Sequence, residues 1–244
     1  MSEDQAVNMI RGKKGASITL TILREGWSQA KDFKITRDTI TIPPMKLEFR
    51  DGGIAYIHIF HFNQTLSDEF KKAAFQILAS PSKKIVLDLR NNPGGYLEVS
   101  QEIAGWFLQD GQVVTIEDFG RGKVRQEYKA QGNSSFAKYP IVVLMNKGSA
   151  SASEILAGAL RDQRNIQLVG ETSFGKGSVQ KLVELKDGLS FLKITVAKWL
   201  TPKGNSISEV GLSPDVKVEA NAEDIKAGKD LQLEKALEII KGLK

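Results

Sequence analysis

The sequence predicts an α/β fold with a mostly parallel central sheet and flanking helices. Three short apolar segments have the length and composition of buried strands, namely Lys84–Leu89, Ile141–Met145 and Ile166–Val169. Helical segments alternate with them, at Glu98–Leu108 and in an Ala/Leu-rich stretch that ends near Arg161. Because parallel neighbours need a long crossover connection, this alternation favours β-α-β units with helices on the faces of the sheet.

The first forty residues predict a smaller piece. Ser2-Glu3-Asp4-Gln5 has the spacing of a capping box and predicts a short helix through Ile10. Two strand-like runs follow, at Ala16–Arg24 and Phe33–Ile40. One helix and one hairpin bury too little apolar surface to form a core, so we expect an incomplete domain.

The pattern changes at Met45, where the larger domain begins. Besides the elements named above, this domain is expected to contain strands at Lys46–Phe49, Ile54–Phe62, Val113–Ile116, Val179–Leu185 and Leu189–Ala197, and helices at Ser67–Leu78 and Leu231–Ile240. The two domains are therefore predicted to be residues 1–42 and 43–244.

The composition excludes several classes of function. No stretch approaches the roughly 18 consecutive apolar residues that span a membrane. With no cysteine and only His58 and His61, the chain cannot form disulfides, thiolate nucleophiles or Cys- or His-rich metal sites. The net charge is +5, but the lysines are interleaved with acids, so we expect a solvated basic surface and no nucleic-acid interface.

Three loops follow the three buried strands, at Arg90–Leu97, Lys147–Ser151 and Glu171–Lys176. The carboxyl ends of neighbouring parallel strands open on the same edge of a sheet, and α/β proteins collect reactive groups there. The sequence therefore predicts one site built from all three loops.

The second of these loops is the best place for a nucleophile. Gly148 to Ser151 are small residues that allow a tight passage from strand into helix. The first backbone N–H groups of that helix have no helical partner and can stabilise negative charge on a carbonyl oxygen. Ser149, Ser151 and Ser153 are all candidates, and each taken alone is equally suited to be a helix cap.

A base for such a serine is expected on the third loop. His58 and His61 lie within a predicted strand and are expected to pack there. Lys176 stands between Gly175 and Gly177, and a lysine can act as a base when burial lowers its pKa. A solvated turn lysine is the alternative interpretation.

Two other motifs overlap Lys176. Gly170–Gly177 imitates a phosphate-binding loop, but Gly177 stands where Ser or Thr is required, and a strand rather than a helix follows. Ser173-Phe174-Gly175-Lys176 matches the Ser-x-x-Lys of penicillin-recognising enzymes, but the helical context and the companion motifs are missing. Neither interpretation is favoured.

Several motifs, in sequence order, resemble those of the carboxyl-terminal processing peptidases, also called tail-specific proteases. They are Val86–Gly95, Lys147–Glu154, Gly170–Gln180 and the closing motif Val210-Gly211-Leu212-Ser213-Pro214-Asp215. The resemblance covers most of Met45–Lys244. It implies a crotonase- or ClpP-like peptidase core and a serine endopeptidase with a Ser–Lys pair that needs neither a metal nor an organic cofactor.

The resemblance also implies roles for individual residues. Ser151 matches the family's nucleophile, Lys176 its general base, and Gln180 the glutamine that holds the lysine amine in place. The backbone N–H groups of Ala152 and of Gly95 or its neighbour would form the oxyanion hole.

The amino-terminal piece resembles the second half of a PDZ domain, with its peptide-groove helix at Ser2–Ile10. In this family the PDZ domain binds the C-terminal tail of the substrate and gates the protease. Arg11 follows the groove helix and is a candidate contact to the substrate or the peptidase domain; a plain surface arginine is the other interpretation. The backbone loop with which PDZ domains capture a terminal carboxylate is not found in this sequence.

We therefore expect an endopeptidase that acts on protein or peptide substrates with apolar C-terminal tails. The resemblance implies an extracytoplasmic location, in the periplasm or cell envelope, with the targeting segment outside this chain, and it is compatible with a homo-oligomer. The main alternative is a PDZ-type peptide-binding protein with an inactive or ungated peptidase core. A further alternative is another acyl-transfer enzyme on a related sheet, such as an enoyl-CoA hydratase-like protein.

Overall fold

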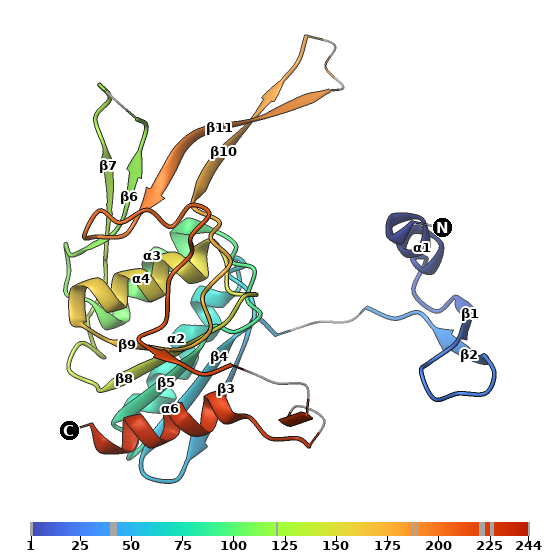
Figure 1. Cartoon of the computed structure of the whole chain (residues 1–244), viewed down its shortest axis with the longest axis horizontal. Coiled ribbons are helices and arrows are strands. Elements are labelled where there is room, and N and C mark those ends of the chain that lie inside the picture. The colour runs from blue at the N-terminus through green and yellow to red at the C-terminus, as the bar shows by residue number, and fades with distance from the viewer. Residues whose placement is uncertain are drawn as a thin grey trace. The chain divides into compact units, whose positions relative to one another are not determined.

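The computed structural model describes residues 2–39, 43–120, 122–186, 188, 190–219, 223–224 and 227–243 (Figure 1). It divides the chain into two units, Met1–Ile42 and Pro43–Lys244. The boundary between them coincides with the change of pattern in the sequence.

A capped helix and a hairpin make up the first unit. Helix α1 (Glu3–Ile10) begins with the predicted capping box, in which the Gln5 N–H donates to Ser2 Oγ at 3.3 Å and the Ser2 N–H donates to Gln5 Oε1 at 3.0 Å. Strands β1 (Ser17–Ile22) and β2 (Lys31–Thr36) pair antiparallel. The predicted second strand extended to Ile40, which lies outside the described residues.

Arg37 ties the helix of this unit to its hairpin. Its Nε donates to the Ile10 carbonyl at 2.7 Å and its Nη1 to the Ser17 carbonyl at 3.3 Å. None of the described residues of the unit is buried. Its identification as part of a PDZ domain stays a prediction.

The second unit is built on a six-stranded sheet. Its strands follow the order β12 (Val216–Lys217), β9 (Gln167–Gly170), β8 (Ile141–Met145), β5 (Lys84–Asp88), β4 (Ile54–Ile59) and β3 (Met45–Arg50). Every neighbouring pair is parallel except β3 and β4, so the predicted mostly parallel sheet is confirmed. The two-residue strand β12 was not predicted, because so short a segment has no periodicity.

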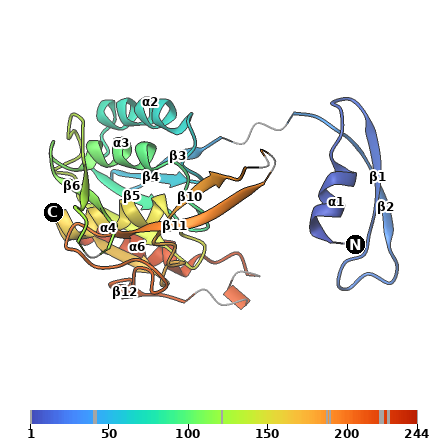
Figure 2. The same ribbon diagram turned by 90° about the horizontal axis from the view of Figure 1, so that it is seen from above.

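Helices cover both faces of this sheet (Figure 1), and Figure 2 gives the view from above. Helices α2 (Leu66–Ala79), α3 (Leu97–Phe107) and α4 (Ala152–Arg164) share one core with the sheet, and α6 (Leu231–Gly242) shares another. Successive side chains of a strand point to opposite faces. Ile57 of β4 therefore packs toward α2, whereas its neighbour Tyr56 packs toward α6.

A second, antiparallel sheet was not predicted. It has the order β10 (Ser178–Glu184), β11 (Phe191–Leu200), β6 (Val113–Asp118) and β7 (Gln126–Lys129). The sequence identified three of these strands but not their pairing, and β7 lies in a polar segment that we had not assigned to a strand. Leu189, with which one predicted strand began, lies outside the described residues.

A buried ion pair fastens α6 to the end of β5. Asp88 is fully buried, and Arg90 donates to it from Nε at 3.0 Å and from Nη2 at 2.6 Å. Arg90 also donates from Nη1 to Asp230 at 2.7 Å, and Asp230 in turn accepts from the Leu233 N–H at 3.0 Å as the cap of α6. The hydroxyl of Tyr56 donates to Asp88 at 2.7 Å, which adds β4 to the cluster. One guanidinium therefore joins the sheet, the loop after β5 and the last helix.

Replacing Asp230 by Asn should lower the free energy of unfolding by about 1 kcal/mol at neutral pH, because the amide keeps the helix cap but loses the charge that faces Arg90. Burial opposes ionisation of Asp230, but the hydrogen bonds from Arg90 and the Leu233 N–H outweigh it and hold the pKa of Asp230 below its ordinary value. Such a carboxylate stabilises the fold above its unfolded pKa, about 3.9, and loses that contribution as the pH falls through its folded pKa.

Denaturant unfolding at a series of pH values measures this effect. The difference between the wild type and Asp230→Asn should be constant above about pH 5 and shrink below about pH 4. Asp110→Asn, at an exposed loop position, serves as the control and should show no such dependence. A difference for Asp230→Asn that persists unchanged in acid would contradict the assignment.

Candidate active site

The three predicted loops meet at the carboxyl edge of the large sheet. The Ala150 N–H donates to the Asn92 carbonyl at 2.9 Å, and the Phe174 N–H donates to the Ser149 carbonyl at 2.9 Å. The loop after β8 is thus hydrogen-bonded to the loop after β5 on one side and to the loop after β9 on the other. Topology brings together residues that are distant in the sequence.

Ser151 is set apart from the two serines that flank it. The hydroxyl of Ser149 donates to the Leu89 carbonyl at 2.8 Å, and that of Ser153 donates to the Asn92 carbonyl at 3.0 Å; both side chains are buried. Ser151 is only half-buried and stands directly before α4 with φ 56° and ψ −116°. A serine with positive φ is strained by roughly 1–3 kcal/mol, and such strain is typical of functional sites.

Two backbone N–H groups near Ser151 have no acceptor among the described residues, namely those of Ala152 and Gly95. The N–H of Gly94, by contrast, donates to Asn92 Oδ1 at 2.9 Å. Of the two glycines only Gly95 therefore has an N–H available to a ligand. The Ala152 and Gly95 N–H groups are the donors that the sequence had suggested for an oxyanion hole.

The loop of Gly94 and Gly95 has no room for a side chain. A Cβ on Gly94 would lie 2.8 Å from the Cβ of Ser151 and 2.9 Å from the Ala152 nitrogen. A Cβ on Gly95 would lie 2.1 Å from the Phe62 carbonyl oxygen. Glycine is thus required here because the backbone of this loop touches the start of α4 and the end of the β4 segment.

The carboxylate of Glu154 connects the serine loop to the lysine loop. Its Oε2 accepts the N–H of Ser151 at 2.8 Å and the N–H of Lys176 at 3.0 Å. Its Oε1 accepts the N–H of Gly175 at 2.7 Å and the hydroxyl of Ser173 at 2.5 Å. The side chain is buried, with 1% of the residue exposed, so these donors replace its hydration.

Sequence reasoning missed Glu154. The available signal was the Ser-x-x-Glu spacing of Ser151 and Glu154, which is that of a capping box. The spacing could suggest the bond between Glu154 and the Ser151 N–H, but not the three donors that arrive from the loop after β9.

Ser173 extends this network to the closing motif. Its hydroxyl accepts the N–H of Leu212 at 2.7 Å, and its own N–H donates to the Leu212 carbonyl at 3.1 Å. The N–H of Glu209 donates to the Gly175 carbonyl at 2.9 Å. The segment around residues 209–212 therefore supports the lysine loop by three hydrogen bonds.

The backbone of Lys176 is held by a hydrogen bond to Glu154, whereas its side chain has no hydrogen-bond partner among the described residues. The residue is exposed, and within the described parts of the chain no hydrogen bond joins its amine to Ser151 Oγ or to Gln180. Gln180 lies in β10, is exposed and pairs with Thr195 beside a bulge. The backbone N–H groups of Ser151 and Lys176 thus donate to one carboxylate, whereas their side chains form no hydrogen bond with each other in the described structure.

The other residues considered from the sequence lie elsewhere. Arg11, exposed, ends α1 in the first unit, where its N–H donates to the Val7 carbonyl at 2.9 Å. His58 lies in β4 with its ring 4.3 Å from that of Phe60, as a packed strand residue would. Within the described ranges there is no group of three His, Cys, Asp or Glu residues suited to a metal ion, nor a helix long and apolar enough to cross a membrane.

Comparison with known proteins identifies similar sequences. The model of peptidase family S41 matches residues 53–218. The carboxy-terminal processing protease CtpA of Bacillus subtilis is 40% identical over 219 residues, which cover 90% of this chain and 46% of that protein. The carboxyl-terminal-processing protease of Synechocystis sp. is 36% identical over 249 residues, which cover 99% of this chain and 57% of that protein. The chain thus spans about half the length of the curated relatives it matches.

A solved structure has the same fold. The photosystem II D1 C-terminal processing protease superimposes with a TM-score of 0.71 at 29% identity, over 99% of this chain and 64% of that one. The similarity extends over the sheet and the loops that carry Ser151 and Lys176.

Replacing Glu154 by Gln should lower the free energy of unfolding by about 2–4 kcal/mol, because an amide NH₂ would face N–H groups that now donate to a carboxylate oxygen. Denaturant unfolding measures the change. Glu234→Gln is a matched control, since Glu234 is also an acid in the first turn of a helix but is exposed. A loss for Glu154→Gln no larger than that of the control would show that the carboxylate does not hold the two loops together.

Proposed function

The chain belongs to peptidase family S41, and from that premise we propose that it is a serine endopeptidase with Ser151 as nucleophile and Lys176 as general base. The observation that carries the proposal is the surroundings of Ser151. Its hydroxyl is the only one of the three neighbouring serine hydroxyls not donated to a backbone carbonyl in the described structure. Ser151 also lies beside two backbone N–H groups that have no acceptor among the described residues. Its own backbone N–H donates to the carboxylate of Glu154, which also accepts the backbone N–H of Lys176.

The reaction uses these groups in sequence. Ser151 Oγ attacks the carbonyl carbon of the scissile peptide bond while the neutral Lys176 amine accepts the hydroxyl proton. The N–H groups of Ala152 and Gly95 donate to the oxygen on which negative charge develops. Lys176 then returns the proton to the leaving amine, and water hydrolyses the resulting ester with Lys176 again as base.

The exposure of Lys176 bears on how this chemistry is switched on. An amine in water is protonated near neutral pH and cannot accept a proton; removing water from around it lowers its pKa. We propose that bound substrate covers the Lys176 amine and turns it toward Ser151, with Gln180 as its further hydrogen-bond partner. Glu154 keeps the Lys176 backbone in place, so only the side chain has to move.

The substrate proposal comes from the relatives. Their names describe processing at carboxyl ends, and we propose that this chain likewise acts on proteins presented by their C-terminal tails, apolar tails in particular. In this proposal the first unit belongs to a PDZ domain that binds the tail, with Arg11 as a contact residue. The proposed location is outside the cytoplasm, in the periplasm or cell envelope.

The alternative, a peptide-binding module without peptidase chemistry, is not favoured. The family match covers residues 53–218, which include all the proposed catalytic groups. The surroundings of Ser151 keep the donors that an oxyanion needs, and a protein that only bound peptides would have no use for them.

Two variants test the chemistry. With a loosely folded protein substrate that ends in an apolar tail, Ser151→Ala should abolish cleavage as followed by mass spectrometry. Lys176→Arg should lower the rate roughly 10²–10⁴-fold, the usual contribution of a general base, because guanidinium does not lose its proton. Lys181→Arg, an exposed lysine of β10, is the matched control and should cleave normally.

Labelling by a fluorophosphonate probe provides a second measurement. The probe should react with the wild type and not with Ser151→Ala. Equal cleavage or equal labelling of both proteins would overturn the assignment of the nucleophile.

A further inference from the structure

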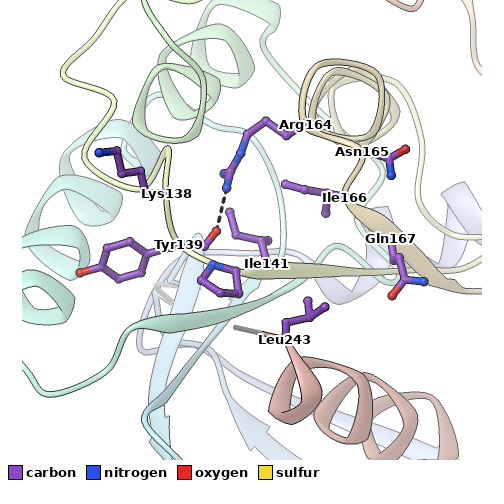
Figure 3. Close-up of a pocket in the computed structure, with 9 residues that line it drawn as sticks. Lys138, Tyr139, Ile141, Arg164, Asn165, Ile166, Gln167 and Leu243 are labelled. Atoms are coloured by element: carbon purple, nitrogen blue, oxygen red, sulfur yellow. Dashed lines mark hydrogen bonds between the residues drawn. The ribbon is translucent and has the colours of Figure 1, made fainter.

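A pocket lies at the amino-terminal edge of the large sheet, opposite the edge that carries Ser151. Its volume is about 450 Å³. The segment before β8, the end of α4, the turn into β9 and the residue after α6 form its walls (Figure 3). The proposed peptidase mechanism uses none of these residues, so the pocket is distinct from the candidate active site.

Arg164, at the end of α4, is the central polar group of this pocket. Its Nη1 donates to the carbonyls of Phe107 and Phe136 at 3.3 and 3.2 Å, and its Nη2 donates to the Tyr139 carbonyl at 2.7 Å. Figure 3 shows the side chain reaching from α4 to the Tyr139 carbonyl. These bonds orient the guanidinium without neutralising it.

Part of the donor capacity of Arg164 is unused. A guanidinium has five N–H groups. Among the described residues nothing accepts from Nε, and only one acceptor is found for the two hydrogens of Nη2. Nε–H and the adjacent Nη2–H form the side of the fork that binds a carboxylate with two parallel hydrogen bonds.

The charge around the pocket is positive. Lys138 is a second cation in its lining, and none of the described residues that line it is an acid. Outside the lining, the Lys83 Nζ lies 3.3 Å from the Tyr139 hydroxyl. In the part of the chain that the structure describes, neither Arg164 nor either lysine has a carboxylate within ion-pair distance. Burial lowers the pKa of Arg164, as expected for a cation removed from water without a counter-ion.

The rest of the lining is mixed: Ile141, Ile166 and Leu243 are apolar, whereas Asn165 and Gln167 are polar. Ile141 and Ile166 are 3% and 6% exposed, and Leu243 lies on the side of the pocket away from Arg164 in Figure 3. Leu243 is the exposed apolar side chain of the three, at 37%, and a small ion such as sulfate bound at Arg164 would leave it uncovered. A ligand that reaches both groups needs an anionic end for the guanidinium and an apolar stem for Leu243.

We propose that this pocket binds a carboxylate carried on a short apolar stem, with Arg164 as its bidentate partner and Lys138 as a second cation. The C-terminal residue of a peptide and a free aliphatic acid share this chemistry. The pocket therefore gives the protein a ligand site on the far side of the sheet from Ser151, separate from the tail recognition proposed for the first unit.

Titration by NMR with isoleucine and leucine methyl labels tests the proposal on the full chain. Acetyl-leucine, acetyl-alanyl-leucine and hexanoate are the probes, and acetyl-leucinamide is the uncharged control. We expect saturable shifts of the Ile141, Ile166 and Leu243 methyls with the acids and none with the amide. A stronger response to the dipeptide than to hexanoate would identify a peptide end as the ligand, and the reverse would identify a free acid.

Replacing Arg164 would remove three internal hydrogen bonds and could disturb the fold. The test therefore uses a variant that changes the charge at another lining residue. Gln167 lines the pocket and is exposed, and Gln167→Glu adds a negative charge without changing shape. It should weaken acid binding at least about tenfold, since like charges repel at short range, while Gln126→Glu in β7 leaves binding unchanged. Absence of saturable shifts, equal binding of the amide, or no effect of Gln167→Glu would each overturn the proposal. Ser151→Ala should bind the probes like the wild type, so failure of the peptidase assignment would be seen separately.

Discussion

The buried carboxylate of Glu154 is the interaction on which the candidate site depends. One side chain accepts hydrogen bonds from the N–H groups of Ser151, Gly175 and Lys176 and from the Ser173 hydroxyl. A buried carboxylate is tolerated only when donors replace its hydration. Glu154 and the two loops therefore hold each other in place, and the loop of Ser151 cannot shift independently of the loop of Lys176.

The parallel sheet makes this arrangement available. β5, β8 and β9 end at the same edge, so the loops that follow them meet although they are distant in the sequence. At the same edge, on the face covered by α6, Arg90 joins Asp88 in the sheet to Asp230 at the start of that helix. The loop that carries Gly95 begins at this ion pair, so the packing of the last helix anchors the start of that loop.

The two edges of the sheet have opposite chemistry. At the carboxyl edge a carboxylate is satisfied by backbone donors, and the lysine side chain stays in water. At the amino edge Arg164 donates to backbone carbonyls, and no acid is among the described residues that line its pocket. Each edge therefore combines a main chain held by hydrogen bonds with a cation that has no carboxylate partner among the described residues.

The sequence by itself determined the buried strands and the helices of the large domain and the three loops of the site, but not the short strand β12 or the polar strand β7, because apolar periodicity and length specify only buried strands locally. Local pattern alone left Ser149, Ser151 and Ser153 equivalent, and the choice of Ser151 and Gly95 came from the family resemblance. The tertiary structure supplies the physical distinction, since the carbonyls of Leu89 and Asn92 accept the hydroxyls of Ser149 and Ser153, and Asn92 Oδ1 accepts the N–H of Gly94. Glu154, the pairing of the second sheet and the open fork of Arg164 were likewise decided by partners far away in the chain, which no local pattern encodes.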